Sequence, residues 1–205
     1  MSPDPAWDVV TAAVRAISPV PDDDLAALFA AGRRRHLRRG EALTRAGEPA
    51  RHGAVVLAGG LCEYFELADG TRRTKGFSLP GSFAGSLSDL LGTAAGGVSR
   101  GWVVAEVPSE VLSVPWDRYL ALVETRPAWA RFAQSLVESL YLQKVAREYE
   151  LLAVDAAGRY RRTLARFPGV EGVFRQHHIA SYVGVTPQHL SRLRARQAHL
   201  VHLGE

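Results

Sequence analysis

The side chains with the clearest chemistry lie near the carboxyl end, in the stretch QHHIASYVGVTPQHLSRLRA at residues 176–195. Gln188 and Arg192 are four residues apart, so a helix would place them on one face. In the major groove of DNA, glutamine can make paired hydrogen bonds to adenine and arginine to guanine. The spacing therefore predicts a helix that reads bases through an exposed polar face, which would also include Ser191 and Ala195.

Two short helices joined by a tight turn would hold this face outward. Ile179 and Val183 repeat at helical spacing, Gly184 interrupts the period, and apolar residues resume beyond it. Glycine can take the positive φ that a turn between crossed helices needs. Thr186 suits an N-cap and Pro187 the first helical position. The pattern predicts a helix-turn-helix, although any two helices joined at a glycine give a similar one.

Basic residues gather in the same part of the chain. From Asp155 onward there are eight arginines and three acidic residues, whereas the rest of the chain has 17 basic and 18 acidic residues. A phosphate-binding surface beside the helix-turn-helix would require such an excess of positive charge. A basic surface that faces only solvent is the alternative, because it would have the same composition.

Composition excludes several classes of protein. The 205 residues suffice for one large domain or two smaller ones. The longest apolar run, 25–31, is far shorter than a membrane span, and the amino terminus resembles no secretory signal, so we expect a cytoplasmic protein without membrane contact. The single cysteine, Cys62, excludes an internal disulfide and a four-cysteine iron–sulfur cluster, and we expect it to be a small apolar strand residue.

The middle of the chain has the pattern of a β domain. From Leu37 to about Val114, short apolar runs are cut by Gly, Pro and Asp at intervals of about ten residues, which predicts a jelly-roll sandwich or barrel. The expected strands are 54–58, 61–67, 72–79, 102–107 and 111–114, with a hairpin turn at 68–71. Two helices, 7–17 and 22–31, should precede them, and the basic run 33–39 reads as a solvated strand edge.

One segment of this domain differs from the rest. In PGSFAGSLSDLLG, residues 80–92, Gly81 and Gly85 allow sharp turns and Ser86 can cap a short helix. Free backbone N–H groups at such a turn can cradle a phosphate or carboxylate, and an ordinary loop across the barrel mouth fits the pattern equally well.

A long helix should follow the β domain. From Pro127 onward, apolar residues continue at helical spacing for roughly seven turns and occupy more than one side of the helix. A second copy of the chain would bury the far side, which predicts a homodimer; packing twice within one chain is the alternative. The predicted class is α+β: a jelly-roll domain with N-terminal helices over 1–120, a long dimerisation helix over 121–154 and a helix-turn-helix domain over 155–205.

These elements in this order resemble the CRP/FNR family of transcription regulators. The resemblance rests on HLRRGEALTRAGEPARHGAVVLAGGLCEYFELADGTRRTKGFSLPGSFAGS at 36–86 and AAGRYRRTLARFPGVEGVFRQHHIASYVGVTPQHLSRLRA at 156–195. It implies a dimer on a palindromic double-stranded DNA site, with RNA polymerase as a candidate partner. Pro187 stands where some relatives have a base-reading arginine. The family's base-facing positions correspond to Gln188, His189 and Arg192, and those near phosphates to Thr186, Ser191 and Arg194.

The stretches that correspond to the family's effector site depart from its pattern. In members that bind cyclic AMP, a Gly-Glu-Leu phrase and an Arg-Ser-Ala phrase hold ribose and phosphate; here the matching residues are Gly85-Ser86-Leu87 and Ser99-Arg100-Gly101. Ser86 replaces the glutamate, and the arginine moves by one place to the other face of a strand. We therefore expect no cyclic AMP and no cofactor, and any small effector stays unidentified. Haem ligation through His52 or His36 is left open.

Two other classes of function compete with a DNA-binding regulator. A cupin-type metal enzyme needs clustered histidines, yet residues 37–114 contain only His52, and no Ser-His-Asp or Cys-His phrase is present, so we expect neither a metal nor a catalytic site. A ligand-binding signalling module whose helix-turn-helix docks a protein remains the alternative to a DNA-binding regulator.

Overall fold

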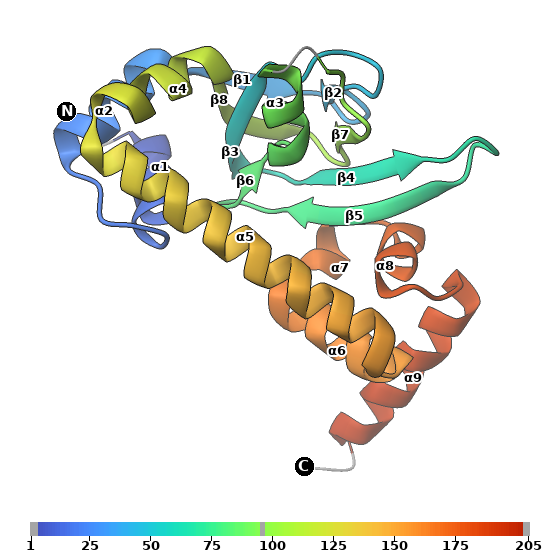
Figure 1. Cartoon of the computed structure of the whole chain (residues 1–205). Coiled ribbons are helices and arrows are strands. Elements are labelled where there is room, and N and C mark those ends of the chain that lie inside the picture. The colour runs from blue at the N-terminus through green and yellow to red at the C-terminus, as the bar shows by residue number, and fades with distance from the viewer. Residues whose placement is uncertain (1–3, 95–96, 203–205) are drawn as a thin grey trace.

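The structure is a computed structural model that describes residues 4–94 and 97–202, with the side chains of all but 93–94 and 197–202. A β sandwich lies at one end, helices of the amino-terminal part cover its outer side, and a long helix leads to a group of helices at the carboxyl end (Figure 1). The predicted α+β class is therefore confirmed.

Two four-stranded antiparallel sheets make up the sandwich within the described residues. One has the strand order β1-β8-β3-β6 and the other β2-β7-β4-β5. The basic run forms β1, an edge strand, as predicted from its charge. The strand bounds are β1 Arg33–Leu37, β2 Ala42–Thr44, β3 His52–Ala58, β4 Leu61–Glu66, β5 Arg72–Ser78, β6 Phe83–Ala84, β7 Trp102–Ala105 and β8 Ser109–Pro115.

Apolar side chains bury both faces of each sheet. Leu61, Val103 and Val111 fill the space between the sheets. The outer face of the β1-β8-β3-β6 sheet packs under α1 (Pro5–Arg15) and α2 (Asp22–Ala31), together with Trp129 and Phe132 of the long helix. The outer face of the β2-β7-β4-β5 sheet packs against the carboxyl-terminal helices. Among the described residues, one apolar cluster thus lies between the two sheets, and the other two lie on the outer faces of the sandwich.

The long helix α5 spans Pro127–Ala153 and begins at the predicted proline. A separate helix, α4 (Trp116–Thr125), precedes it, and the extended backbone of Arg126 divides the two. This division follows from Pro127, because a residue before proline is disfavoured in the α conformation. A short helix α3, Leu87–Ala94, follows Ser86 in the segment predicted to turn sharply.

The carboxyl-terminal helices form the predicted helix-turn-helix. They are α6 (Ala156–Arg166), α7 (Val170–Val173), α8 (Gln176–Val183) and α9 (Pro187–His202). Asp155 caps α6 by accepting a 2.8 Å hydrogen bond from the Gly158 amide. Gly184 adopts φ +78° between α8 and α9, and Thr186 Oγ1 accepts a 3.2 Å hydrogen bond from His189 N, so both residues play the roles expected of them.

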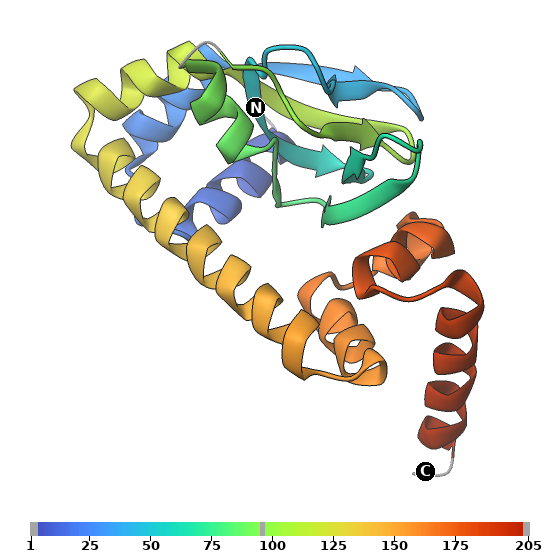
Figure 2. The same ribbon diagram turned by 45° about the vertical axis from the view of Figure 1, so that its right-hand side comes forward.

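Helix α8 packs directly on the β domain, an arrangement visible from two directions (Figures 1 and 2). The Thr74 amide of β5 donates a 2.9 Å hydrogen bond to Ser181 Oγ of α8. Gly60 lies so close to Val173 and Phe174 that a Cβ there would be 2.6 Å from Val173 Cγ1. No helix in the described part of the chain is long and apolar enough to cross a membrane.

Candidate nucleic-acid interface

Helix α9 has one buried face and one exposed polar face. Leu190 and Leu193 are 0% and 8% exposed and join the core beneath the helix. Gln188, Ser191 and Arg192 are all exposed. The side chains of Gln188 and Arg192 make no hydrogen bond or ion pair with any residue that the structure describes, so their donors are available to a ligand.

The other predicted contact residues lie around this face. His189 is half-buried and its backbone amide is bound by Thr186. Arg194 is exposed, but its Nε lies 2.8 Å from Glu171 Oε1, which also accepts a 2.6 Å hydrogen bond from the Tyr160 hydroxyl. Arg194 is therefore tied to α7, whereas Arg192 is not.

Several arginines counted in the basic surplus are bound to other residues within the fold. Arg159 donates 2.8 Å and 2.6 Å hydrogen bonds to the carbonyls of Val183 and Val154, which lie at the ends of α8 and α5. Arg166 binds Glu150 and the Tyr182 hydroxyl. Arg159 thus satisfies carbonyls left unpaired at helix ends. Arg166 joins α6 to α5 and α8 through a carboxylate and a hydroxyl.

Glu150, near the end of α5, is the centre of this arginine cluster. It is 2% exposed, and its carboxylate accepts hydrogen bonds of 2.7 Å and 3.2 Å from Arg166. Arg147 and Arg162 lie 3.5 Å and 3.9 Å away, and Arg147 also donates to the Tyr182 carbonyl. Burial alone would raise the pKa of the Glu150 carboxyl, but the hydrogen bonds and charge of Arg166, with the charges of Arg147 and Arg162, lower it.

A second polar cluster joins α8 to the β domain. His178 Nε2 lies 3.1 Å from Glu106 Oε1, and its Nδ1 lies 3.4 Å from Thr74 Oγ1 and 3.6 Å from Cys62 Sγ. The hydrogen bond from His178 lowers the pKa of Glu106 despite its partial burial. Burial raises the pKa of the Cys62 thiol to about 12, which keeps it protonated and unreactive at neutral pH.

The stretches expected to form an effector site come together around α3. Ser86 is buried beside Gly85 and Leu87, and its Oγ accepts a 3.2 Å hydrogen bond from Lys75, which pairs with Glu63 at 2.5 Å. Asp89 is also buried and accepts hydrogen bonds of 2.7 Å from Ser99 Oγ and 3.3 Å from the Arg100 amide. The side chain of Arg100 itself is exposed.

These residues do not fit a cyclic nucleotide held in the family's manner. A cyclic phosphate needs a cationic partner in a pocket sheltered from water. The site instead presents the carboxylate of Asp89, while Lys75 is neutralised by Glu63 and Arg100 points to solvent. Elsewhere, the described residues contain no group of three or more His, Cys, Asp or Glu side chains that could hold a metal ion.

The comparisons with known proteins agree with the observed fold. Residues 34–126 match the family of the cyclic nucleotide-binding domain. FixK2 from Bradyrhizobium japonicum superposes with a TM-score of 0.65 at 22% identity, over 82% of this chain and 85% of its own. The c-di-GMP-responsive global regulator CLP from Xanthomonas campestris gives 0.64 at 18%, over 87% and 93%. A protein described as a transcriptional regulator of the CRP/FNR family from Eubacterium rectale gives 0.66 at 14%, over 88% and 85%.

This chain shares its fold with these proteins, one of which is described as a CRP/FNR regulator. The resemblance expected from the sequence is thereby confirmed at the level of the fold, and CLP and the Eubacterium rectale protein are both described as regulators. No curated protein matches the sequence.

Sequence reasoning missed the residues that hold the carboxyl-terminal helices in place. Glu150 was visible only as one acid in a long helix, and its partner Arg166 lies sixteen residues away on α6. The one available signal was an acidic residue beside apolar positions near the end of α5. His178 and Glu106 are 72 positions apart in sequence, and nothing local to either residue indicates their contact.

Replacing Glu150 with alanine should lower the free energy of unfolding by about 3 kcal/mol, because Arg166 and Arg147 would keep partly buried charges without a partner. Glu148→Ala, an exposed acid on the same helix, is the control and should change stability by less than about 0.5 kcal/mol. Guanidinium unfolding of each protein measures both values. Equal stability of the two variants would show that Glu150 does not hold the helices together.

The Glu150 effect should also depend on pH. Its carboxyl has a lowered pKa in the folded state, so its contribution is present above the ordinary value of 4.5 and is lost as the pH falls through the folded value. The stability difference between the parent protein and Glu150→Ala should therefore shrink in acid, and a difference that grows there would contradict this assignment.

Proposed function

We propose that this chain is a DNA-binding transcription regulator that works as a homodimer and reads a palindromic site through α9. The observation that carries the proposal is the exposed face of α9, where Gln188 and Arg192 have no partner among the described residues although a buried core holds the helix beneath them. Exposed donors on a rigidly supported helix are what base recognition in a major groove requires.

Each side chain of the face has a definite task. Arg192 would pair with guanine and Gln188 with adenine, with His189 beside them. Thr186 and Ser191 would contact phosphates near the helix start. Arg194 would reach a phosphate with the part of its guanidinium that Glu171 leaves open, since its side chain is 47% exposed.

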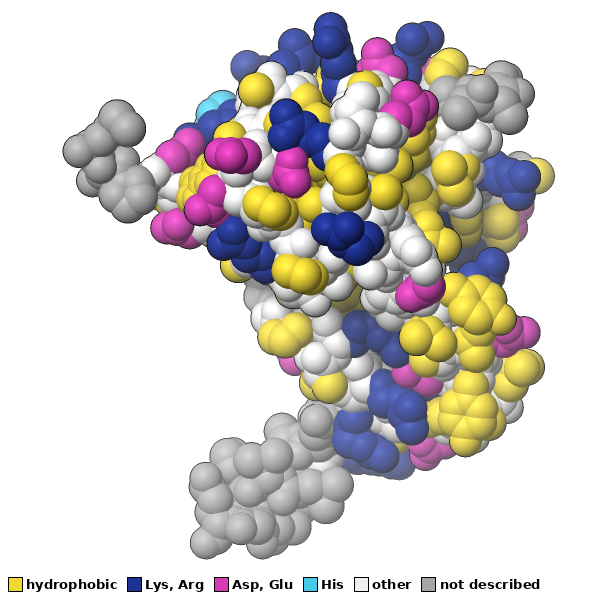
Figure 3. All heavy atoms as spheres, turned by 60° about the vertical axis from the view of Figure 1, so that its left-hand side comes forward, with side chains coloured by type: hydrophobic (Ala, Val, Ile, Leu, Met, Phe, Trp, Pro, Cys, Tyr) yellow, Lys and Arg dark blue, Asp and Glu magenta, His cyan; other side chains and the backbone are white. Residues whose placement is uncertain are grey.

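The partner that we propose for α5 is the same helix of a second copy. Five of its exposed apolar residues follow one stripe at helical spacing and are between 44% and 81% exposed: Val137, Tyr141, Val145, Tyr149 and Leu152. Hydrophobic side chains gather on the side of the molecule along which α5 runs (Figure 3). Two such stripes would bury each other in a symmetric pair.

Regulation would act on the position of α9 in the dimer. The β domain contacts α8 and packs against the start of α5, so an effector that changes either contact would shift the reading helices. RNA polymerase is the partner that such a regulator would meet at a promoter. Cyclic AMP in the segment around α3 is not part of the proposal, because Asp89 occupies that site with the wrong charge.

Arg192→Ala should weaken binding to the preferred DNA site by about 1–3 kcal/mol and relax the preference at one base position, because a paired contact to guanine is lost. The control is Arg118→Ala, an exposed arginine on α4 that leaves α9 untouched. Fluorescence anisotropy on the preferred duplex and its single-base variants gives both results. Equal weakening on every duplex would refute base reading by Arg192, and binding that does not respond to salt would favour protein docking instead.

Val145→Glu should raise the dimer dissociation constant at least about a hundredfold, because symmetry places two carboxylates in an apolar interface. Gln143→Glu adds the same charge two residues away, on the opposite side of the helix, and should leave the dimer intact. Sedimentation velocity over a range of concentrations measures the two constants. A parent protein that stays monomeric throughout, or a Val145→Glu variant that dimerises normally, would contradict the proposed interface.

A further inference from the structure

We infer that Glu171 of α7 sets how strongly this chain binds DNA of any sequence, because it competes with the phosphates for the guanidinium of Arg194. Glu171 is thus a positioning residue, which acts on DNA only through the side chain that it holds. The inference rests on the proposed function and deepens it, since it gives an acidic residue outside α9 control over general affinity and leaves the choice of bases to α9.

The Glu171 carboxylate is held in place before any DNA is bound. It lies on a short helix that is anchored in the core by the buried side chains of Val170 and Phe174. Its Oε1 accepts a 2.6 Å hydrogen bond from the hydroxyl of Tyr160, a side chain that is itself buried. Burial, together with the hydrogen bond and the charge of Glu171, raises the pKa of this hydroxyl, so it remains a donor at neutral pH. The carboxylate is therefore not free to follow a cation that moves toward a ligand.

Arg194 is intermediate between two other arginines of the same domain. Its Nε lies 2.8 Å from Glu171 Oε1, yet its side chain is 47% exposed. Arg166 is bound by the buried Glu150 and is unavailable to a ligand, whereas Arg192 is exposed and has no partner among the described residues. Of these three, only Arg194 is both bound and accessible. An ion pair that is exposed to this degree is weak enough for a phosphate to exchange with it.

Competition with a fixed carboxylate lowers what Arg194 gains from a phosphate. Part of the new hydrogen bonding only replaces the bond to Glu171, and the negative charge of Glu171 cancels some of the attraction to DNA. Arg194 then counts for less than one full phosphate contact in the salt dependence of binding. Because phosphates carry no sequence information, the reduction applies to every duplex alike.

The consequence concerns the DNA that competes with a preferred site. A genome offers about 10⁶–10⁹ non-specific sites, and binding to them depends essentially on phosphate contacts. A restrained Arg194 weakens this background, whereas the proposed base contacts of Gln188 and Arg192 are not affected. Glu171 would thus prevent the chain from binding tightly to bulk DNA.

The Glu171→Gln variant tests the inference, because its amide oxygen can still accept the Tyr160 hydrogen bond but carries no charge. We expect the affinity for a random-sequence duplex to rise at least about threefold. The slope of log K against log salt should steepen by up to about 0.9 for each protomer, the value of one phosphate contact. The preferred duplex should gain about the same factor. Fluorescence anisotropy over a range of salt concentrations measures all three, and a merely structural defect would weaken binding instead.

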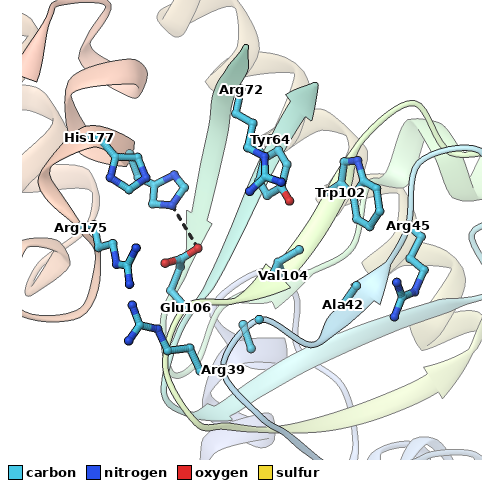
Figure 4. A pocket seen from close by; sticks show the side chains of 13 residues that line it. Arg39, Ala42, Arg45, Tyr64, Arg72, Trp102, Val104, Glu106, Arg175 and His177 are labelled. Carbon is cyan, nitrogen blue, oxygen red and sulfur yellow. Dashed lines mark ion pairs between the residues drawn. The ribbon is translucent and has the colours of Figure 1, made fainter. Parts of the chain in front are cut away.

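The effect should require Arg194. Added to Arg194→Ala, the Glu171→Gln change should alter the affinity less than about twofold, since the side chain through which it acts is gone. Glu148→Gln removes an exposed acid of α5 and should also alter it less than about twofold. Arg45→Ala is the matched control for Arg194→Ala and should leave the salt dependence unchanged, because this exposed arginine lies on the β domain beside Trp102 (Figure 4).

An unchanged or lower affinity of Glu171→Gln would overturn the inference. A gain that persists in the Arg194→Ala background would do the same, because it would show direct repulsion of the phosphates by Glu171. A gain confined to the preferred duplex would also contradict it. If the parent protein binds duplex DNA and Glu171→Gln binds equally, this inference alone fails. If the parent protein binds no duplex, the proposed function fails and this inference fails with it.

Discussion

The position of α6 and α8 relative to the long helix α5 depends on one buried carboxylate. Glu150 of α5 binds Arg166 of α6, and Arg166 also donates a 2.9 Å hydrogen bond to the Tyr182 hydroxyl of α8. Arg147 closes the group by donating to the Tyr182 carbonyl, and its guanidinium lies 4.2 Å from the Tyr182 ring centroid. Three helices thus meet at one acid, and a buried charge of this kind fixes a geometry more than it adds stability. The orientation of α9 relative to α5 follows from it.

The β domain holds the same helices from the other side. Phe77 of β5 contacts the rings of Phe167, Phe174 and Tyr182, with centroids 4.5 to 5.4 Å apart. The helix-turn-helix is therefore held between α5 and the outer face of a sheet.

The sequence was sufficient for elements whose signals are local. Helical spacing, Pro127 and Gly184 predicted α5 and the turn between α8 and α9. Helix α7 has only four residues, too few for a period to show, and α4 was hidden because it adjoins a strand and a long helix. The sequence does contain a signal that β4 is covered on both faces, because the adjacent residues Leu61 and Cys62 are both apolar and point to opposite faces of the strand. Both residues are buried in the structure. The roles of Arg159, Arg166 and Glu150 could not be predicted, because they depend on residues that only folding brings together.

The central claim is that rigid links hold two copies of α9 at one fixed separation. Selection of preferred sites from random duplex DNA by the purified protein tests it most directly. We expect inverted half-sites at a single spacing, about 10 base pairs centre to centre, because the Glu150 cluster and the sheet hold α9 in one position. Enrichment of half-sites at many spacings, or as direct repeats, would contradict it.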